Sequence, residues 1–249
     1  VERANKINEL NLQLLKSNKE LSLLKQSLEE KVDKRTREIK KIQHVTIFAL
    51  ARLAESRDQE TGDHLGRIRK YCWIIARELS NSKQYKGYID NRYVSNIFHS
   101  SPLHDIGKVG ITDSILLKPG KLTVEEFDVM KSHTIIGGKT LEDAEKQLRK
   151  KTKSFLSMGK NIAYCHHEKW DGSGYPFGLK GTEIPLSARI VALADVYDAL
   201  TSKRIYKESM THQVAKDIIY QGSEKHFDPV IVEAFYKLED RFLEISKKY

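Results

Sequence analysis

The sequence is poor in proline and cysteine. Five prolines in 249 residues, few strand-like alternations and abundant Leu, Ile, Ala, Lys and Glu favour an all-α fold over a β-rich one. The two cysteines, Cys72 and Cys165, lie far apart and outside any C-x-x-C pair, so they give no support to a disulfide framework or a thiolate zinc site. We expect both to be reduced, buried thiols of a cytoplasmic protein.

Membrane and export signals are also missing. The sequence has no run of about 18 apolar residues, so no segment of this chain is expected to span a membrane. It begins with valine and shows no signal peptide. We therefore expect a fragment of a longer protein.

The net charge is +9, which by itself favours an anionic partner. The basic residues, however, are dispersed along residues 1–45 and 146–160, without the pattern of interleaved aromatic side chains that a nucleic-acid platform needs. A polynucleotide partner is therefore not expected, whereas a small anionic substrate is compatible with this balance.

Hydrophobic residues repeat every seven positions near the N-terminus. One heptad seam is formed by Ile7, Leu14, Leu21 and Leu28, with Leu10 and Leu24 at the second position and Ser17 as a gap. The repeat resumes at Val32 and Ile39 after a four-residue shift that would locally unwind a supercoil. We predict that residues 1–43 form a dimerising coiled-coil signalling helix that runs into a second domain, residues 44–249. A single amphipathic helix that packs on its own domain is the alternative.

Two dipeptides indicate a metal centre. His166-His167 is expected at the end of a helix over residues 161–167, and His104-Asp105 is followed three residues later by Lys108. Neighbours on a helix diverge by about 100°, so adjacent imidazoles cannot easily chelate one ion but can each serve one of two ions. A solvated histidine pair at a helix end is the alternative for His166-His167.

Further polar residues stand in unusual surroundings. Glu60 and His64 are four apart and would share a face if this segment were helical, although Gly62 leaves that open. Asp195 and Asp198 lie on one side of an apolar helix predicted from Pro185 to Thr201, where a carboxylate binds a metal, pairs with a charge or caps another group.

The spacing of the remaining candidates is less specific. Arg204 and Lys207 are three residues apart, which suits phosphate oxygens but is equally typical of plain surface charge. His133, taken alone, would more often be structural.

Together these motifs resemble the HD-GYP domain, a branch of the HD metal phosphohydrolases. The resemblance covers about residues 49–235. It is carried by His104-Asp105 with Gly107-Lys108, by residues 118–123 (Lys-Pro-Gly-Lys-Leu-Thr), by His166-His167-Glu168 through Gly174-Tyr175-Pro176, and by Asp198 to Thr201. It implies an all-α HD-domain helical bundle with an HD-GYP extension, residues 44–249, that hydrolyses cyclic di-GMP with two or three divalent ions, iron or manganese.

The resemblance also assigns roles to residues. The positions that match metal ligands are Glu60, His64, His104, Asp105, His133, His166, His167 and Asp195. Glu60 matches a position that is a ligand only in members with a third metal ion. Asp105, which would bridge two ions, and Lys108, near the scissile phosphate, match catalytic positions. Those that match dinucleotide-holding positions are Gly174, Tyr175, Pro176, Arg204 and Lys207.

Two departures from the family pattern and several alternatives remain. Pro102 precedes the His104-Asp105 motif, where it would kink a helix predicted over residues 91–103, and Thr112 replaces a common proline. The leading hypothesis is that the protein is a cyclic di-GMP phosphodiesterase controlled through the N-terminal helix. The alternatives are an HD hydrolase for a mixed cyclic dinucleotide and a signalling module without catalysis. An upstream sensor or receiver domain, as in two-component systems, is expected. The metal's identity and the product, linear pGpG or GMP, stay open.

Overall fold

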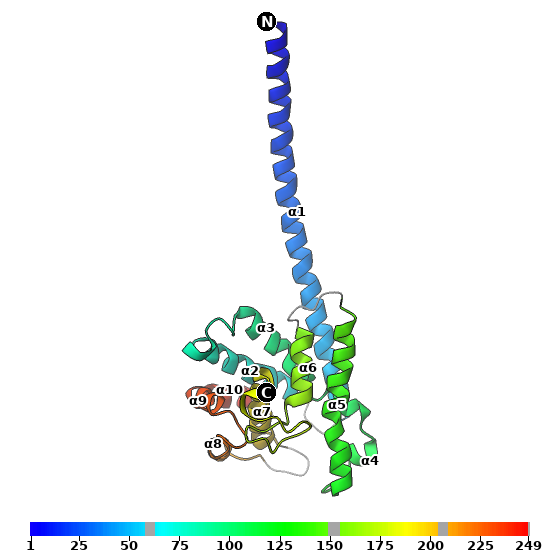
Figure 1. Cartoon of the computed structure of the whole chain (residues 1–249), viewed down its shortest axis with the longest axis vertical. Helices are drawn as coiled ribbons and strands as arrows, with labels where there is room; N and C mark the ends of the chain where they lie inside the picture. Colours follow the sequence, from blue (N-terminus) through cyan, green and yellow to red (C-terminus); the bar gives the residue numbers. More distant parts are fainter. Residues whose placement is uncertain (58–62, 149–154, 204–208, 249) are drawn as a thin grey trace. The chain divides into compact units, whose positions relative to one another are not determined.

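The computed structural model describes residues 1–57, 63–148, 155–203 and 209–248. In these ranges the secondary-structure elements are helices, joined by turns and loops. Within these ranges the nearest approach to sheet pairing is an isolated bridge between Ser223 and Phe227. The α-helices are α1 (Glu2–Glu55), α2 (His64–Ser80), α3 (Asn91–Ser100), α4 (Asp113–Leu116), α5 (Val124–Lys146), α6 (Phe155–Cys165), α7 (Leu186–Thr201), α8 (His212–Gln221), α9 (Pro229–Lys237) and α10 (Glu239–Lys248) (Figure 1). The all-α prediction is confirmed.

The chain divides into two compact units, Val1–Ile47 and Phe48–Tyr249. The first unit is helix alone, and its heptad residues are exposed: Ile7, Leu14, Leu21 and Leu28 have exposed fractions of 57, 60, 64 and 59%. None of the helices among the described residues is long and apolar enough to cross a membrane.

The core of the second unit is organised around four buried aromatic side chains. Tyr71 of α2 stacks on Phe242 of α10, with ring centroids 4.5 Å apart, and Tyr197 of α7 and Phe235 of α9 meet the same Phe242 ring edge-on. Aromatic side chains bury a large apolar area and favour such offset and edge-to-face contacts. This cluster therefore packs α2 against α7, and both helices carry polar residues toward the centre of the unit.

Local sequence signals explain where several helices begin. Asp90 caps α3 by accepting from the Tyr93 amide, and Thr123 and Glu126 form a capping box at α5. Side-chain oxygens of this kind satisfy amide groups that the first helical turn leaves unpaired. Asp228, followed by Pro229, starts α9 in the same way. These caps set the starts of α3, α5 and α9.

The helix predicted over residues 91–103 is shorter than expected. α3 ends at Ser100, and a 3₁₀ turn, η2 (Ser101–Leu103), follows with Pro102 in its first turn. Proline has no amide hydrogen to donate and its ring clashes with the preceding turn. The α-helix therefore stops there, and the tighter turn leads directly into His104 and Asp105.

A close approach of two backbones positions the next segment. η3 (Ile106–Gly110) packs against α5, and a Cβ atom added at Gly107 would collide with the carbonyl oxygen of His133. Only glycine permits this contact. Gly107 thus allows Asp105, two residues earlier, to lie beside the imidazole of His133.

Candidate metal centre

One cluster, here the Asp105 group, consists of Asp105, His133, His166 and His167. One potential ligand atom from each lies within 4.8 Å of the others. Asp105 Oδ1 is 3.2 Å from His133 Nε2 and 3.4 Å from His166 Nε2. The residues come from the start of η3, from α5 and from the turn after α6. Three chain segments thus converge on one carboxylate.

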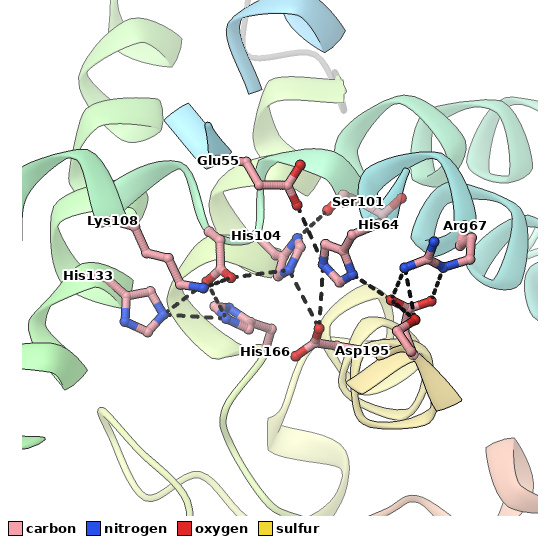
Figure 2. Close-up of polar contacts among 12 residues, drawn as sticks. Glu55, His64, Arg67, Ser101, His104, Lys108, His133, His166 and Asp195 are labelled. Atoms are coloured by element: carbon pink, nitrogen blue, oxygen red, sulfur yellow. Dashed lines mark hydrogen bonds and ion pairs between the residues drawn. The ribbon is translucent and has the colours of Figure 1, made fainter. Parts of the chain in front are cut away.

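A second cluster, here the His64 group, consists of His64, His104 and Asp195, whose ligand atoms also lie within 4.8 Å of one another. Asp195 Oδ1 is 3.7 Å from His64 Nε2 and 3.8 Å from His104 Nε2. Figure 2 shows the imidazoles of His64 and His104 pointing toward the Asp195 carboxylate. His64 is the first residue of α2, and Asp195 lies on α7.

The two groups are joined by the peptide bond between His104 and Asp105, which belong to different groups. His104 Nε2 lies 3.4 Å from Asp105 Oδ2, and the His104 ring lies edge-on to His166 at 5.2 Å. This dipeptide therefore serves both groups, as the two-ion hypothesis requires of adjacent residues.

The expectation for His166 and His167 is wrong in one respect. We predicted that they end a helix and diverge toward different ions, but α6 ends at Cys165 and both histidines follow in a turn. Their rings lie 4.1 Å apart, and both belong to the Asp105 group. Outside a regular helix the angle of about 100° between neighbours no longer applies, so the two imidazoles lie side by side.

Three of the histidines are oriented by backbone carbonyl groups. A carbonyl oxygen only accepts, so a ring nitrogen beside it carries the hydrogen and the opposite nitrogen presents its lone pair. The Nδ1 atoms lie 3.0, 2.7 and 3.1 Å from a carbonyl oxygen in the pairs His104–Ser101, His133–Met130 and His166–Ile162. Each Nε2 is therefore set to ligate a cation, the usual outer-shell arrangement of metal-binding histidines.

His64 is oriented instead by a side-chain network that sequence reasoning did not resolve. Its Nδ1 lies 2.7 Å from Asp198 Oδ2, and Arg67 binds the same carboxylate at 2.6 and 2.9 Å. Burial raises the pKa of Asp198, but hydrogen bonds from Arg67 and His64 outweigh it, and the pKa falls below its ordinary value. The signal was the spacing: Asp198 is three residues beyond Asp195, and Arg67 three beyond His64.

The charge state of the Asp105 group suits a cation. Burial lowers the pKa of both His166 and His167, which keeps them neutral. Burial acts to raise the pKa of Asp105, but Lys108 and the surrounding imidazoles hold it well below its ordinary value. Neutral imidazoles and ionised carboxylates are the forms that bind a metal. Since no cysteine belongs to either group among the described residues, the donors are imidazoles and carboxylates alone, a set unlike the thiolate-rich sets of many structural zinc sites.

Lys108 lies at the edge of the Asp105 group. Its Nζ is 2.7 Å from Asp105 Oδ2, and its side chain is 14% exposed. At this distance the ammonium group compensates part of the negative charge of the Asp105 carboxylate.

The loop that follows His167, here the Tyr175 loop, brings the Tyr175 ring against the Asp105 group. The Tyr175 ring stacks on His167 at 4.7 Å, and its amide donates to the His167 carbonyl at 3.2 Å. Phe127 approaches the same tyrosine ring edge-on at 6.1 Å. The Tyr175–Pro176 peptide bond is cis, and a Cβ added at Gly174 would collide with the backbone of residues 168 and 169.

Glu168 holds this loop, a role that sequence reasoning missed. Its buried carboxylate accepts from the amides of Phe177 and Leu179 at 2.7 and 3.1 Å. From sequence alone, a carboxylate after a histidine pair would be predicted to be a further metal ligand or a surface charge. Only the return of the loop upon itself shows that it binds backbone amides.

Three predicted site residues, Glu60, Arg204 and Lys207, lie outside the described residues. The other predicted residues are all in or beside the two groups or in the Tyr175 loop.

Comparison with known proteins identifies the family of the chain. The family model described as "HD domain" matches residues 49–231. A cyclic di-GMP phosphodiesterase of Vibrio cholerae is 49% identical over 94% of this chain and 48% of its own length. A 3'3'-cGAMP-specific phosphodiesterase of the same organism is 40% identical over 80% of this chain and 35% of its own. The chain thus spans less than half the length of these two relatives.

A solved structure shares the fold. The crystal structure of a cyclic GMP-AMP specific phosphodiesterase of V. cholerae matches with a TM-score of 0.53 and 20% identity, over 81% of this chain and 52% of the other. The match of the family model to most of the chain and the relatives' identity confirm the resemblance that His104-Asp105 and the Gly174-Tyr175-Pro176 loop predicted. The chain belongs to the HD domain family.

Proposed function

We propose that the second unit is a metal-dependent phosphodiesterase that hydrolyses cyclic di-GMP. The observation that carries this proposal is the sharing of the His104–Asp105 dipeptide between two ligand groups. Two neighbouring cation sites are an arrangement that phosphatases and nucleases use. The relatives named cyclic di-GMP phosphodiesterases support this choice of substrate.

In this proposal the His64 group and the Asp105 group each hold a divalent cation, iron or manganese. Such cations would supply Lewis-acid polarisation of a phosphate oxygen and activation of a water molecule. The protein's own contribution is orientation. Backbone carbonyls and Asp198 fix the imidazole tautomers, so the donor atoms need no rearrangement when a cation binds.

The residues around the two groups would receive the substrate. Lys108, held 2.7 Å from Asp105, would neutralise charge that develops on the phosphate under attack. The Tyr175 ring is positioned by its stack on His167 to pack against a guanine base, whose π-face suits an aromatic partner. We assign Gly174 and Pro176 to the shape of this loop, and Arg204 and Lys207 to the phosphate oxygens of the dinucleotide.

The direct test is turnover by the protein loaded with Mn²⁺ or Fe²⁺ without air. Cyclic di-GMP should be consumed, and chromatography would identify pGpG or GMP as the product. Arg204→Ala and Lys207→Ala should mainly raise KM and leave the metal content at the wild-type value. If wild-type protein with a full metal complement leaves cyclic di-GMP intact, the proposed function is wrong.

A mixed cyclic dinucleotide is the second candidate substrate, because a 40% identical relative is named for 3'3'-cGAMP. The same assay with both nucleotides, compared as kcat/KM, decides between them. Binding of cyclic di-GMP without hydrolysis of either nucleotide would favour the remaining hypothesis, a signalling module without catalysis.

We further propose that residues 1–43 form a parallel coiled coil between two copies of the chain and that residues 44–249 form the catalytic domain. The exposed heptad seam from Ile7 to Leu28 supports the dimer, since more than half of each of these side chains is accessible in a single chain. An upstream sensor or receiver domain would act through this helix. The cytoplasmic location expected from two unpaired cysteines stays a prediction.

A further inference from the structure

A cavity of about 350 Å³ lies where α3, α6 and α7 meet. α6 packs against both of the other helices. The cavity is lined by Tyr93 and Asn96 of α3, by Asn161 of α6 and by the start of α7, and none of its described lining residues belongs to the Asp105 group or the His64 group. Small-ligand sites in proteins have volumes of about 300–1,000 Å³. The second unit therefore has room for a small molecule away from its metal ligands.

The first turn of α7 borders this cavity without a side-chain cap. Pro185, Leu186 and Ser187 all line the cavity. The N-cap residue is Pro185, which makes no side-chain hydrogen bond to the helix, and the first turn contains no acidic residue. The backbone amides of Leu186 and Ser187 meet no acceptor among the described residues. A helix N-terminus carries partial positive charge as well as unpaired amides, so this end of α7 favours an anion.

Ser187 adds a buried hydroxyl group at the same place. The residue is 5% exposed and lines the cavity. Its hydroxyl makes no hydrogen bond to another residue in the described part of the chain. Buried hydroxyl groups in folded proteins nearly always have a partner, because an unsatisfied one keeps its full desolvation cost. The side chain of Ser187 therefore calls for an acceptor inside the cavity.

The opposite walls of the cavity supply further donors. The buried hydroxyl of Tyr93 has no hydrogen-bond partner in the described structure. Burial raises the pKa of Tyr93, so this hydroxyl keeps its hydrogen. Asn96 and Asn161 each bring a side-chain amide to the wall, and the NH₂ group of an amide donates two hydrogen bonds. Hydroxyl and amide donors thus surround the cavity on three helices.

The charges at the cavity also suit an anion. Arg92 and Asp90 are the two charged residues among its described lining. The Asp90 carboxylate accepts from the Tyr93 amide at 2.7 Å as the cap of α3, where the positive end of that helix compensates its charge. The exposed Arg92 side chain carries a guanidinium group, whose planar donors match the oxygens of a phosphate.

We propose that this cavity binds a small phosphorylated ligand, with the phosphate group at the start of α7. A phosphate monoester offers three strong acceptor oxygens, which match the amides of Leu186 and Ser187 together with the Ser187 hydroxyl. A cyclic dinucleotide consists of two nucleotides and is large for a cavity at the lower end of the usual range, whereas inorganic phosphate or a mononucleotide fits. The site is therefore separate from the substrate site of the proposed function.

The test is a calorimetric titration of the Mn²⁺-loaded full chain, freed of excess metal, with inorganic phosphate and separately with GMP. Asn161→Asp is nearly isosteric but places a negative charge against the anion, so it should weaken one phosphate site per chain by on the order of 10²-fold. Ser187→Ala removes one donor and should weaken the same site by about tenfold. Asn8→Asp adds an equal charge to the exposed surface of α1 and should titrate like the wild type.

Metal content separates this site from the metal centre, which can itself bind phosphate. Both cavity variants should keep the Mn²⁺ content of the wild type. If Asn161→Asp loses phosphate and Mn²⁺ together, the phosphate was bound by the metal and the proposal is wrong. Isotherms of the two variants that superimpose on the wild type would also overturn it. If Asn161→Asp folds poorly by circular dichroism, the comparison of Ser187→Ala with the wild type decides.

The two phosphate probes distinguish the sources of the ligand. Tighter binding of GMP than of inorganic phosphate would identify a nucleotide, and equal affinities would identify free phosphate. Binding of succinate at this cavity without binding of either phosphate probe would contradict the proposal. No titration contains cyclic di-GMP, so a chain that binds phosphate here but leaves cyclic di-GMP intact would contradict the proposed function alone.

Discussion

The Asp105 group and the His64 group use the same kinds of ligand but orient them differently. In the Asp105 group, His133 and His166 are oriented by backbone carbonyls within one helical turn. In the His64 group, His64 depends on Asp198, a side chain 134 positions away in the sequence. A hydrogen bond from a histidine to a backbone carbonyl survives any substitution that leaves the helix intact. A hydrogen bond to a side chain is lost when that one residue is replaced. The Asp105 group should therefore be robust to substitution around it, and the His64 group sensitive.

The largest expected effect is on the carboxylate at the junction of the two groups. Asp105→Asn should lower kcat by on the order of 10³-fold or more, because an amide neither carries the charge nor replaces both contacts of the carboxylate. Metal analysis should show loss from the Asp105 group. Asp128→Asn, an exposed carboxylate on α5 paired with Lys131, is the control. Substantial activity in metal-loaded Asp105→Asn would break the two-ion assignment.

The next largest effect is expected at Asp198, the side chain that orients His64. Asp198→Asn should weaken Mn²⁺ binding at the His64 group by about 10- to 100-fold, the usual consequence of losing an outer-shell carboxylate. The Asp105 group should fill normally. Ser202→Ala removes a hydroxyl beside the same pair without changing its charge and should bind metal nearly as the wild type does. Equal weakening at both groups would contradict the difference in how their histidines are oriented.

A smaller effect is expected from the Tyr175 loop, which contains Glu168 and contributes no residue to either group. Glu168→Gln keeps one acceptor but turns an amide toward the Leu179 N–H, so one hydrogen bond is lost and the loop loosens, at a cost of about 1–3 kcal/mol. KM for cyclic di-GMP should rise about tenfold through displacement of Tyr175, with the metal content unchanged. Glu183→Gln, an exposed carboxylate in the same region, should leave KM alone. A fall in kcat with metal loss would instead make Glu168 part of the metal centre.

The smallest effect on chemistry should come from the first unit. A chain that begins at Lys41 lacks the heptad seam and should sediment as a monomer where the longer chain is a dimer. Both groups should keep their ions, because their residues all lie beyond residue 47, and basal kcat should change by only a few-fold. Identical sedimentation of the two chains would contradict the proposed coiled coil.

Much of the fold could be predicted from the sequence, because the signals are local. Caps such as Asp90 and the Thr123–Glu126 box act within one turn, so a short stretch of sequence is enough to mark where such a helix begins. The sequence also supplied the residue types of the centre, since the spacing of His104-Asp105 and the Gly174-Tyr175-Pro176 loop is specific to one family. These features need no knowledge of distant contacts.

The grouping of the ligands and the supporting residues were decided by tertiary structure alone. The end of α6 at Cys165 placed His166 and His167 in one group, against the helical prediction. The contacts of Asp198 and Glu168 depend on how α7 and the Tyr175 loop pack around the centre. A buried carboxylate has the same sequence signature whether it meets an arginine, as Asp198 does, or backbone amides, as Glu168 does. Its contacts are decided only by the groups that packing brings beside it.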